Sequence, residues 1–289
     1  MIPPEFDYMR PHSIDEAVTE LGRAGEDAKV LAGGQSLLPL LRLRLAYPTV
    51  LVDLGGVGEL RGVRRDGDEL VIGSMTTHHE VMHDPLVAEH CPLLAQATST
   101  VADPAVRHRG TFGGALSHAD PAGDLGAVAL ALDAQFVATG PSGERTIPAA
   151  DFWVAYRRTA LEPDELILRV RIPVAGGREA RFRKIGTRRA QAISKVVMAL
   201  AWRESDGGSS RTWSDVRLAL GSVADRPIRV LETEAVLEGA APTPETADEA
   251  AAALASEISP IDDVRSTADY RRAVAARVLY RLIRDAGGW

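Results

Sequence analysis

The sequence predicts an α+β protein in three parts, and three observations predict it. Short apolar runs alternate with helical periodicity over residues 14–54, which is typical of a β-α-β unit. Residues 60–172 carry turn signals between apolar runs, which indicates a mixed sheet with helices. After residue 178, three apolar runs precede three helical segments, and this order predicts a three-stranded antiparallel sheet with helices.

The first part, residues 1–56, begins with a helix start signal. Ser13 and Glu16 form a capping-box pattern ahead of apolar residues at helical spacing, so we predict a helix over 14–24. We expect this part to end at Gly55-Gly56. The remaining expected elements are a strand over 29–32, a helix over 36–45 and a strand over 49–54.

The second part, residues 57–175, contains two turn signals of the kind that join hairpin strands. They are Asp66-Gly67-Asp68 and Pro141-Ser142-Gly143. The run Val174-Ala175-Gly176-Gly177-Arg178 breaks the pattern, and we place a domain boundary there. The expected elements are strands over 60–64, 69–74, 135–138 and 165–172, a helical stretch over 77–102 interrupted at Pro85 and Pro92, and a helix over 125–132.

The third part, residues 178–289, is expected to form a meander of three strands covered by helices. Asp206-Gly207-Gly208-Ser209-Ser210 separates the last two strands. The final helix carries apolar residues at helical spacing and many arginines, which predicts a packed stripe opposite a polar face. The strands are expected over 180–186, 194–204 and 214–223, the helices over 230–239, 244–258 and near the C-terminus, the stripe at Tyr270, Val274, Val278 and Leu282, and the polar face at Arg271, Arg272, Arg277, Arg281 and Arg284.

Composition and charge limit the kind of protein. The chain has 289 residues and is 45% hydrophobic, which is enough for more than one core. Its net charge is −7, from 33 basic and 40 acidic residues without a long run of either sign, so we expect no nucleic-acid partner. The N-terminus lacks the pattern of a signal peptide, and no apolar run reaches about 18 residues. We therefore expect a cytoplasmic protein without an integral membrane segment.

The chain has a single cysteine, Cys91. An intramolecular disulfide is therefore excluded, and an iron–sulfur cluster, which needs several thiolates, cannot be held by this chain alone. Any such cluster must lie in a partner. We expect Cys91, which lies in an apolar stretch, to be an inert packed thiol.

Two glycine-rich segments are the candidate binding loops. Residues 32–37 read Ala-Gly-Gly-Gln-Ser-Leu, and residues 109–115 read Arg-Gly-Thr-Phe-Gly-Gly-Ala. Glycine lets main-chain N–H groups approach a pyrophosphate without a Cβ in the way, and a following helix adds further donors. Both loops could close on one dinucleotide. We expect Gly33→Val or Gly114→Val to abolish its binding in a folded protein, because a Cβ would occupy pyrophosphate space.

These motifs together resemble the FAD-binding (medium) subunit of the molybdenum hydroxylases, a family that includes aerobic carbon monoxide dehydrogenase and xanthine dehydrogenase. The resemblance rests on residues 32–36, residues 111–114 and the sequence Asp-Pro-Ala-Gly-Asp at 120–124, in matching order and spacing. It extends to residues 184–189 and the C-terminal part, and so covers almost the whole chain. The fold it implies is a two-lobed FAD-binding fold, with a small β-α-β lobe and a mixed-sheet lobe, followed by the C-terminal domain.

The resemblance implies a set of FAD-binding residues. Ser36 and Thr111 each offer a hydroxyl to the phosphates, and Asp124, an acceptor when ionised, suits a ribose or ribityl hydroxyl. Lys184 matches a lysine near the isoalloxazine, where a positive charge would stabilise reduced flavin, and Leu168 would pack against the ring. The full set is Ala32, Gly33, Gly34, Gln35, Ser36, Leu37, Thr111, Gly113, Gly114, Ala115, Ser117, Gly123, Asp124, Leu168 and Lys184.

The function that the resemblance implies is electron transfer. FAD would accept electrons from [2Fe–2S] clusters of a small iron–sulfur subunit and pass them to an external acceptor, while a large molybdopterin subunit performs the substrate chemistry. Family analogy suggests a dimer of heterotrimers. Two alternatives remain open, a self-sufficient flavin oxidoreductase of the same fold superfamily and a scaffold that has lost its flavin.

Other residues have competing interpretations. His78, His79, His83 and His90 contain a helical pair that could share a metal, but no carboxylate or thiol cluster joins them in a recognised ligand pattern, so we expect no metal site. His118 and Asp120 could form a general-base pair, and loop shape with FAD contact is the interpretation we favour. We expect no catalytic residue in this chain.

Overall fold

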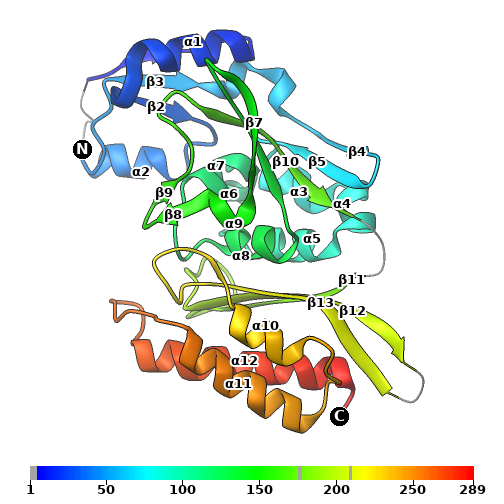
Figure 1. Ribbon diagram of the computed structural model, residues 1–289. Coiled ribbons are helices and arrows are strands. Elements are labelled where there is room, and N and C mark those ends of the chain that lie inside the picture. Colours follow the sequence, from blue (N-terminus) through cyan, green and yellow to red (C-terminus); the bar gives the residue numbers. More distant parts are fainter. Residues whose placement is uncertain (1–4, 175–177, 208–209) are drawn as a thin grey trace.

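The computed structural model describes residues 5–174, 178–207 and 210–289. Figure 1 shows three parts stacked one on another, in the order of the sequence, with the N-terminal part at one end and the C-terminal helices at the other. The α+β fold class is confirmed. No helix within the described ranges is long and apolar enough to cross a membrane.

The N-terminal part is the expected β-α-β unit with one further strand. The sheet has the order β1-β3-β2 with parallel pairs, and the short strand β1 was not expected. The Ser13 side chain accepts from the Glu16 N–H at 3.2 Å and starts the first helix where predicted. The second helix ends earlier than expected, because Arg44 takes a positive φ of 55°. The elements are β1 (Asp7–Met9), α1 (Ile14–Ala24), β2 (Ala28–Leu31), α2 (Leu37–Arg42) and β3 (Val50–Asp53).

The middle part is a five-stranded sheet of order β4-β5-β10-β6-β7. Every pair in it is antiparallel, so the expected mixed sheet is corrected to an antiparallel one. The strand expected from residue 60 begins at Val63, because Leu60 belongs to a 3₁₀ turn and Gly62 has a φ of 99°. The strands are β4 (Val63–Asp66), β5 (Glu69–Gly73), β6 (Gln135–Gly140), β7 (Gly143–Pro148) and β10 (Leu166–Pro173), and a small pair is β8 (Trp153–Ala155) with β9 (Arg158–Thr159).

Short helices follow β5, and prolines divide them as predicted. Pro85 and Pro92 each occupy the first turn of a new helix, where a missing N–H costs nothing. All eight residues of α8 are buried, because it lies between the middle part and the C-terminal sheet. The helices are α3 (His78–His83), α4 (Pro85–His90), α5 (Pro92–Ser99), α6 (Pro104–Arg107), α7 (Phe112–Ser117), α8 (Asp124–Ala131) and α9 (Ala149–Phe152).

The C-terminal part is an antiparallel sheet with one face on α8 and the other on three helices (Figure 1). Alternate residues of its second strand divide between the cores: Val197 joins the middle core, and Val196 and Met198 join the C-terminal core. The expected three-stranded meander gains a fourth, two-residue strand after Pro227. The elements are β11 (Arg178–Ile185), β12 (Val196–Gly207), β13 (Ser210–Gly221), β14 (Ile228–Arg229), α10 (Leu231–Leu237), α11 (Pro244–Glu257) and α12 (Ala268–Gly287).

Two predicted breaks fall partly outside the described residues. Residues 175–177 of the proposed domain boundary and residues 208–209 of the proposed turn are among the positions that the structure does not describe.

The buried face of α12 differs from the one expected. Its buried residues are Arg271, Ala275, Leu279, Leu282 and Ile283, whereas Tyr270 is 44% exposed. Of the predicted stripe, Leu282 is buried and Val274 and Val278 are partly buried against the same core, whereas Tyr270 was wrongly placed on it. Arg271 was wrongly placed on the polar face. Arg271 is buried because its guanidinium donates to acceptors inside the protein.

An ion-pair cluster joins the middle part to the C-terminal sheet. Asp133, just after α8, accepts from Arg178, Arg217 and Arg229, which lie on β11, β13 and β14. Several arginines around one carboxylate fix the orientation of α8 against the sheet, so the residues that begin α8 are held close to β11.

Candidate functional site

The two glycine loops lie directly against each other. A Cβ added to Gly33 would be 2.1 Å from the carbonyl oxygen of Arg109 and 2.7 Å from Cα of Gly110. A Cβ added to Gly114 would be 2.6 Å from Oγ1 of Thr111 and 3.3 Å from Cβ of Ala32. At Gly33 the predicted reason is therefore wrong, because the added Cβ would meet the second loop, and a larger residue would push the loops apart. At Gly114 the nearest atom is the Thr111 hydroxyl oxygen of the same loop. The effect of either valine on FAD binding stays a prediction.

The first loop presents unused donors. In the described part of the chain, the main-chain N–H groups of residues 33–37 have no hydrogen-bond partner, and neither has the exposed hydroxyl of Ser36. Gly34 has a φ of 72°, which a residue with a side chain rarely adopts. Gln35 donates to the carbonyl of Gly33 at 3.0 Å and thereby braces the loop. Successive free N–H groups around such a turn form a concave anion site.

The second loop supports the first. The N–H groups of Phe112 and Gly113 donate to the carbonyls of Thr76 (2.8 Å) and Ser74 (2.9 Å), and that of Gly114 donates to the Thr111 hydroxyl at 3.2 Å. These three N–H groups build the start of α7, so they are already used within the protein. That this loop also supplies donors to a ligand stays a prediction. The hydroxyl hydrogen of Thr111 remains able to donate.

Close contact with β5 fixes the second loop. A Cβ on Gly113 would be 2.5 Å from Cβ of Ser74, so only glycine fits there. The hydroxyl oxygen of Ser74 is buried without a hydrogen-bond partner among the described residues. Ala115 and Ser117 are exposed further along α7.

Asp124 and Lys184 are paired with each other. One carboxylate oxygen of Asp124, at the start of α8, accepts from Nζ of Lys184 on β11, and the other accepts from the hydroxyl of Ser194. Lys184 also donates to the carbonyl of Thr100 at 3.0 Å. Burial raises the pKa of Asp124, while Lys184 and Ser194 act to lower it. Asp124 and Lys184 thus form one buried, mutually compensated pair, and their contacts with a flavin hydroxyl and with the isoalloxazine stay predictions.

Gly123 precedes this pair and shapes the turn before α8. Its N–H donates to the carbonyl of Asp120 at 2.8 Å. A Cβ there would lie 3.0 Å from the same oxygen, so the turn favours glycine.

Leu168 belongs to the N-terminal core. Its side chain is 5% exposed and packs in the cluster that includes Leu21, Val52 and Leu60. Its carbonyl accepts from the N–H of Ser74 at 3.0 Å. Packing of Leu168 against a flavin ring stays a prediction, and the structure gives this side chain a core function.

His118 and Asp120 are joined through Arg157, which the sequence did not single out. The guanidinium lies 2.8 Å from Oδ2 of Asp120 and 3.1 Å from Nε2 of His118. Asp120 also accepts from the N–H of Ala122 at 2.9 Å. These bonds support the interpretation that the two residues shape the loop ahead of Asp124.

The other candidate residues have structural surroundings. His78 is buried with its ring against Gly110, and burial lowers its pKa to about 4. Burial likewise raises the pKa of the Cys91 thiol to about 12, as expected of an inert cysteine. In the ranges that the structure describes, no group of His, Cys, Asp and Glu is arranged to hold a metal.

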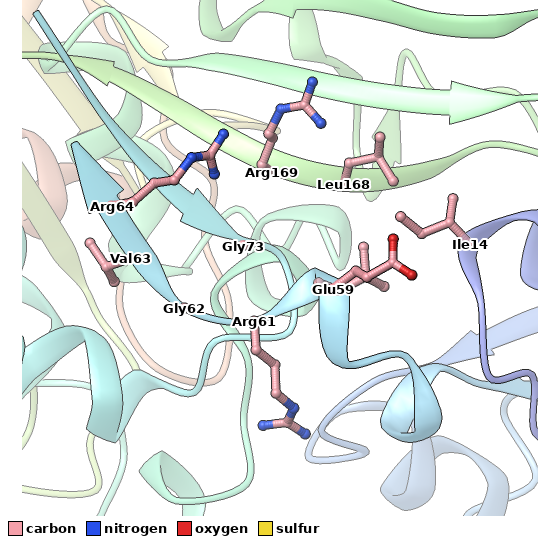
Figure 2. Close-up of a pocket in the computed structure, with 10 residues that line it drawn as sticks. Ile14, Glu59, Arg61, Gly62, Val63, Arg64, Gly73, Leu168 and Arg169 are labelled. Atoms are coloured by element: carbon pink, nitrogen blue, oxygen red, sulfur yellow. The ribbon is translucent and has the colours of Figure 1, made fainter. Parts of the chain in front are cut away.

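A small cavity lies apart from the glycine loops (Figure 2). It measures about 170 Å³ and opens between the start of α1, the end of β5 and the first half of β10, with Arg61, Arg64 and Arg169 around it. None of its lining residues belongs to either loop. Ligand pockets for larger molecules have about 300–1,000 Å³, so this cavity is too small for a dinucleotide.

Comparison with known proteins covers the whole chain. The family model described as FAD binding domain in molybdopterin dehydrogenase matches residues 4–175, and that described as CO dehydrogenase flavoprotein C-terminal domain matches residues 181–286. The carbon monoxide dehydrogenase medium chain of Hydrogenophaga pseudoflava is 40% identical over 287 residues, covering 99% of this chain and 98% of that one. The nicotine 6-hydroxylase medium subunit of Paenarthrobacter nicotinovorans is 38% identical, covering 98% of each chain.

Solved structures agree. The carbon monoxide dehydrogenase structure from H. pseudoflava matches with a TM-score of 0.93 at 41% identity, over 97% of this chain and 96% of that one. Quinoline 2-oxidoreductase from Pseudomonas putida 86 matches with a TM-score of 0.92 at 34% identity, over 100% and 99% of the two chains.

Proposed function

Because the chain belongs to the FAD-binding medium subunits of the molybdenum hydroxylases, we propose that its first glycine loop holds the pyrophosphate of that FAD. The relatives are medium chains and FAD subunits of multi-subunit oxidoreductases, so the alternative of a self-sufficient flavin oxidoreductase is not favoured. The observation that carries the placement is the run of N–H groups at residues 33–37, which have no hydrogen-bond partner among the residues that the structure describes.

The residues present fit FAD. Free N–H groups and the Ser36 hydroxyl provide donors for two phosphates, while the second loop keeps the first in shape through the contact of Gly33 with Arg109 and Gly110. Thr111 keeps one hydroxyl hydrogen for the same ligand. Ala32, Gly34, Gln35, Leu37, Ala115, Ser117 and Gly123 belong to the proposed contact surface on these loops.

The proposed place of the flavin ring is beside Lys184 and Asp124. FAD, when bound, accepts electrons from a donor and passes them to an acceptor. The chain binds and orients it, and the ammonium of Lys184 lies next to the carboxylate of Asp124 at the junction of α8 and β11. A paired cation favours the reduced, anionic ring less than a lone one, so Asp124 moderates the effect of Lys184 on the flavin potential.

In this family the molybdopterin and iron–sulfur groups belong to other subunits. We further propose a cytoplasmic complex in which this chain joins a large molybdopterin subunit and a small [2Fe–2S] subunit as a dimer of heterotrimers. The domain limits proposed for this chain are 1–56, 57–175 and 178–289. The mass of the purified complex in solution tests the assembly, because two copies of each of three chains differ clearly from one copy of each.

Replacing Gly34 tests the placement of the pyrophosphate. Gly34→Ala puts a side chain at a φ of 72°, a conformation that costs roughly 1–2 kcal/mol, and displaces the N–H groups around it. Gly239→Ala is a matched control, since Gly239 has a φ of 75° with open space around it at the end of α10. We expect Gly34→Ala to weaken FAD binding about tenfold or more and Gly239→Ala to leave it unchanged, as measured by equilibrium flavin fluorescence.

Equal FAD affinity in both variants would show that the first loop is not the phosphate site. A wild-type chain that holds no FAD, alone or in its complex, would contradict the FAD function itself.

A further inference from the structure

Ser194 links the carboxylate of Asp124 to the C-terminal part. It lies between β11 and β12, is 1% exposed, and donates its hydroxyl to Oδ1 of Asp124. The hydroxyl of Ser222 in turn donates to the carbonyl of Ser194 at 3.0 Å. The carboxylate of Asp124 is therefore held by Ser194, and Ser194 is in turn held by Ser222, which follows β13.

Ser222 also holds the loop that leads into Asp124. Its N–H donates to the carbonyl of Pro121 at 2.7 Å. It has a φ of 66°, which costs energy in a residue other than glycine, so this geometry is imposed by its surroundings. A Cβ on the preceding Gly221 would lie 3.1 Å from the same Pro121 oxygen, which shows how closely β13 approaches the loop.

Arg271 clamps this arrangement from α12. One nitrogen of its guanidinium donates to the main-chain carbonyls of Ser222 (2.9 Å) and Lys195 (3.1 Å). Ser222 belongs to the chain of hydrogen bonds, and Lys195 follows Ser194 in sequence. The other terminal nitrogen of the guanidinium donates to Asp263 at 2.7 Å. Arg271 is 3% exposed, and its charge is compensated by Asp263. Burial acts to raise the pKa of Asp263, but hydrogen bonds from the N–H of Arg265, from Arg271 and from the N–H of Ser266 lower it to about 2.

We propose that Ser194, Ser222 and Arg271 are positioning residues that fix the carboxylate of Asp124 against Lys184, so that the C-terminal domain sets the charge beside the flavin. The proposal rests on the proposed function, because it requires the Asp124–Lys184 pair to lie near the ring. It gives the C-terminal domain a part in the redox site beyond Lys184 itself.

If Arg271 only filled space, the position would not require an arginine. An apolar side chain of similar size would fill the same space between α12 and the sheet without the desolvation cost of a buried guanidinium. The guanidinium instead donates to two main-chain carbonyls, that of Lys195, next to Ser194, and that of Ser222. Arg271 therefore orients these two segments, which an apolar side chain would not do.

The test follows the flavin midpoint potential of the FAD-loaded chain against pH. In the wild type we expect an inflection at the pKa of Asp124, and Asp124→Asn should remove it. Ser194→Ala removes one hydrogen bond from the ionised carboxylate and should move the inflection up by about one pH unit. Ser194→Thr, which keeps the hydroxyl, should restore it. Ser205→Ala, on the strand β12 that follows Ser194, should leave it in place.

Arg271 has a matched control on its own helix. Arg271→Met should move the inflection in the same direction by a smaller amount, whereas Arg272→Met, which removes an exposed arginine paired with Asp269, should not. A merely structural role would lower the melting temperature of both Ser194→Ala and Arg271→Met without moving the inflection. That outcome overturns the proposal.

Two further outcomes distinguish a failure of the positioning proposal from a failure of the proposed FAD function. A wild-type inflection that survives Asp124→Asn shows that Asp124 does not act on the flavin, and the positioning proposal fails while FAD binding stands. Failure of the wild-type chain and its complex to bind FAD overturns both.

Discussion

Asp124 and Lys184, both proposed as flavin-site residues, show how far the surroundings of a residue depend on the folded chain. Each was singled out for the charge it would present to a ligand. In the folded chain they neutralise each other, 60 positions apart in sequence, at a site buried between α8 and β11. No local pattern contains such a pairing, because it arises only when the C-terminal sheet packs on α8.

The residues that the sequence did not reveal have the same origin. Ser194, Ser222, Arg157 and Arg271 contact the candidate site through partners that lie 28 to 101 positions away, as the bonds of Ser222 to Ser194 and to Pro121 illustrate. A serine or an arginine carries no periodic or motif signal of its own. The glycine loops were recognisable because close backbone approach excludes every other residue at Gly33 and Gly113.

His78 makes the stability of the chain depend on pH. Burial lowers its pKa from 6.5 to about 4, and Arg107 adds to that effect. The unfolded chain therefore binds the proton first as the pH falls, so stability is complete above pH 6.5 and decreases down to pH 4. The expected loss is about 3 kcal/mol in the free energy of unfolding, as measured by urea titrations at several pH values.

His78→Gln should flatten this dependence between pH 6.5 and 4 relative to the wild type. The matched control His83→Gln removes an exposed histidine from the same helix α3 and should preserve it. A wild-type stability that stays level over this pH range would show that His78 is protonated equally in both states.

At the scale of elements, local signals predicted starts and breaks better than faces. The capping residues of α1 and the prolines of α4 and α5 act within one helical turn, and these boundaries agree with the structure. The face of α12 depends on what covers it. Val274 and Val278 continue the expected periodicity but pack at the margin of the C-terminal core.

Alanine substitutions distinguish the two faces of α12. Leu279 is fully buried against the C-terminal core, so Leu279→Ala should lower the free energy of unfolding by about 2–5 kcal/mol. Tyr270 was expected on the same stripe but is 44% exposed, with its ring 4.9 Å from Nζ of Lys195. Tyr270→Ala should cost about 1 kcal/mol or less, as measured by chemical denaturation. Similar losses in the two variants would contradict the observed face.

At the scale of the whole molecule, the order of the three parts was predictable and their joints were not. Turn signals and periodicity divide the chain, and the resemblance to the flavin subunits supplied the two-lobed arrangement. The contacts between the parts include the ion pairs of Asp133 with arginines of three strands and the contact of Gly33 with the second loop. Both bring together residues far apart in sequence, and both hold the candidate site.

The proposed site draws on all three parts of the chain, which meet at α8. The N-terminal part supplies the first loop, the middle part supplies its support and Asp124, and the C-terminal part supplies Lys184 and Ser194. A flavin held at this meeting point would be oriented by all three parts. Electrons would enter it from a partner, because the one cysteine of this chain cannot hold a cluster.

The most direct measurement is an anaerobic rapid-mixing experiment. The FAD-loaded chain is mixed with the iron–sulfur partner subunit, reduced beforehand and freed of reductant, and the visible spectrum is followed. We expect the flavin absorbance to bleach as the cluster absorbance of the oxidised partner returns. A flavin that stays oxidised beside a cluster that stays reduced would contradict the claim that this chain receives electrons from its partner.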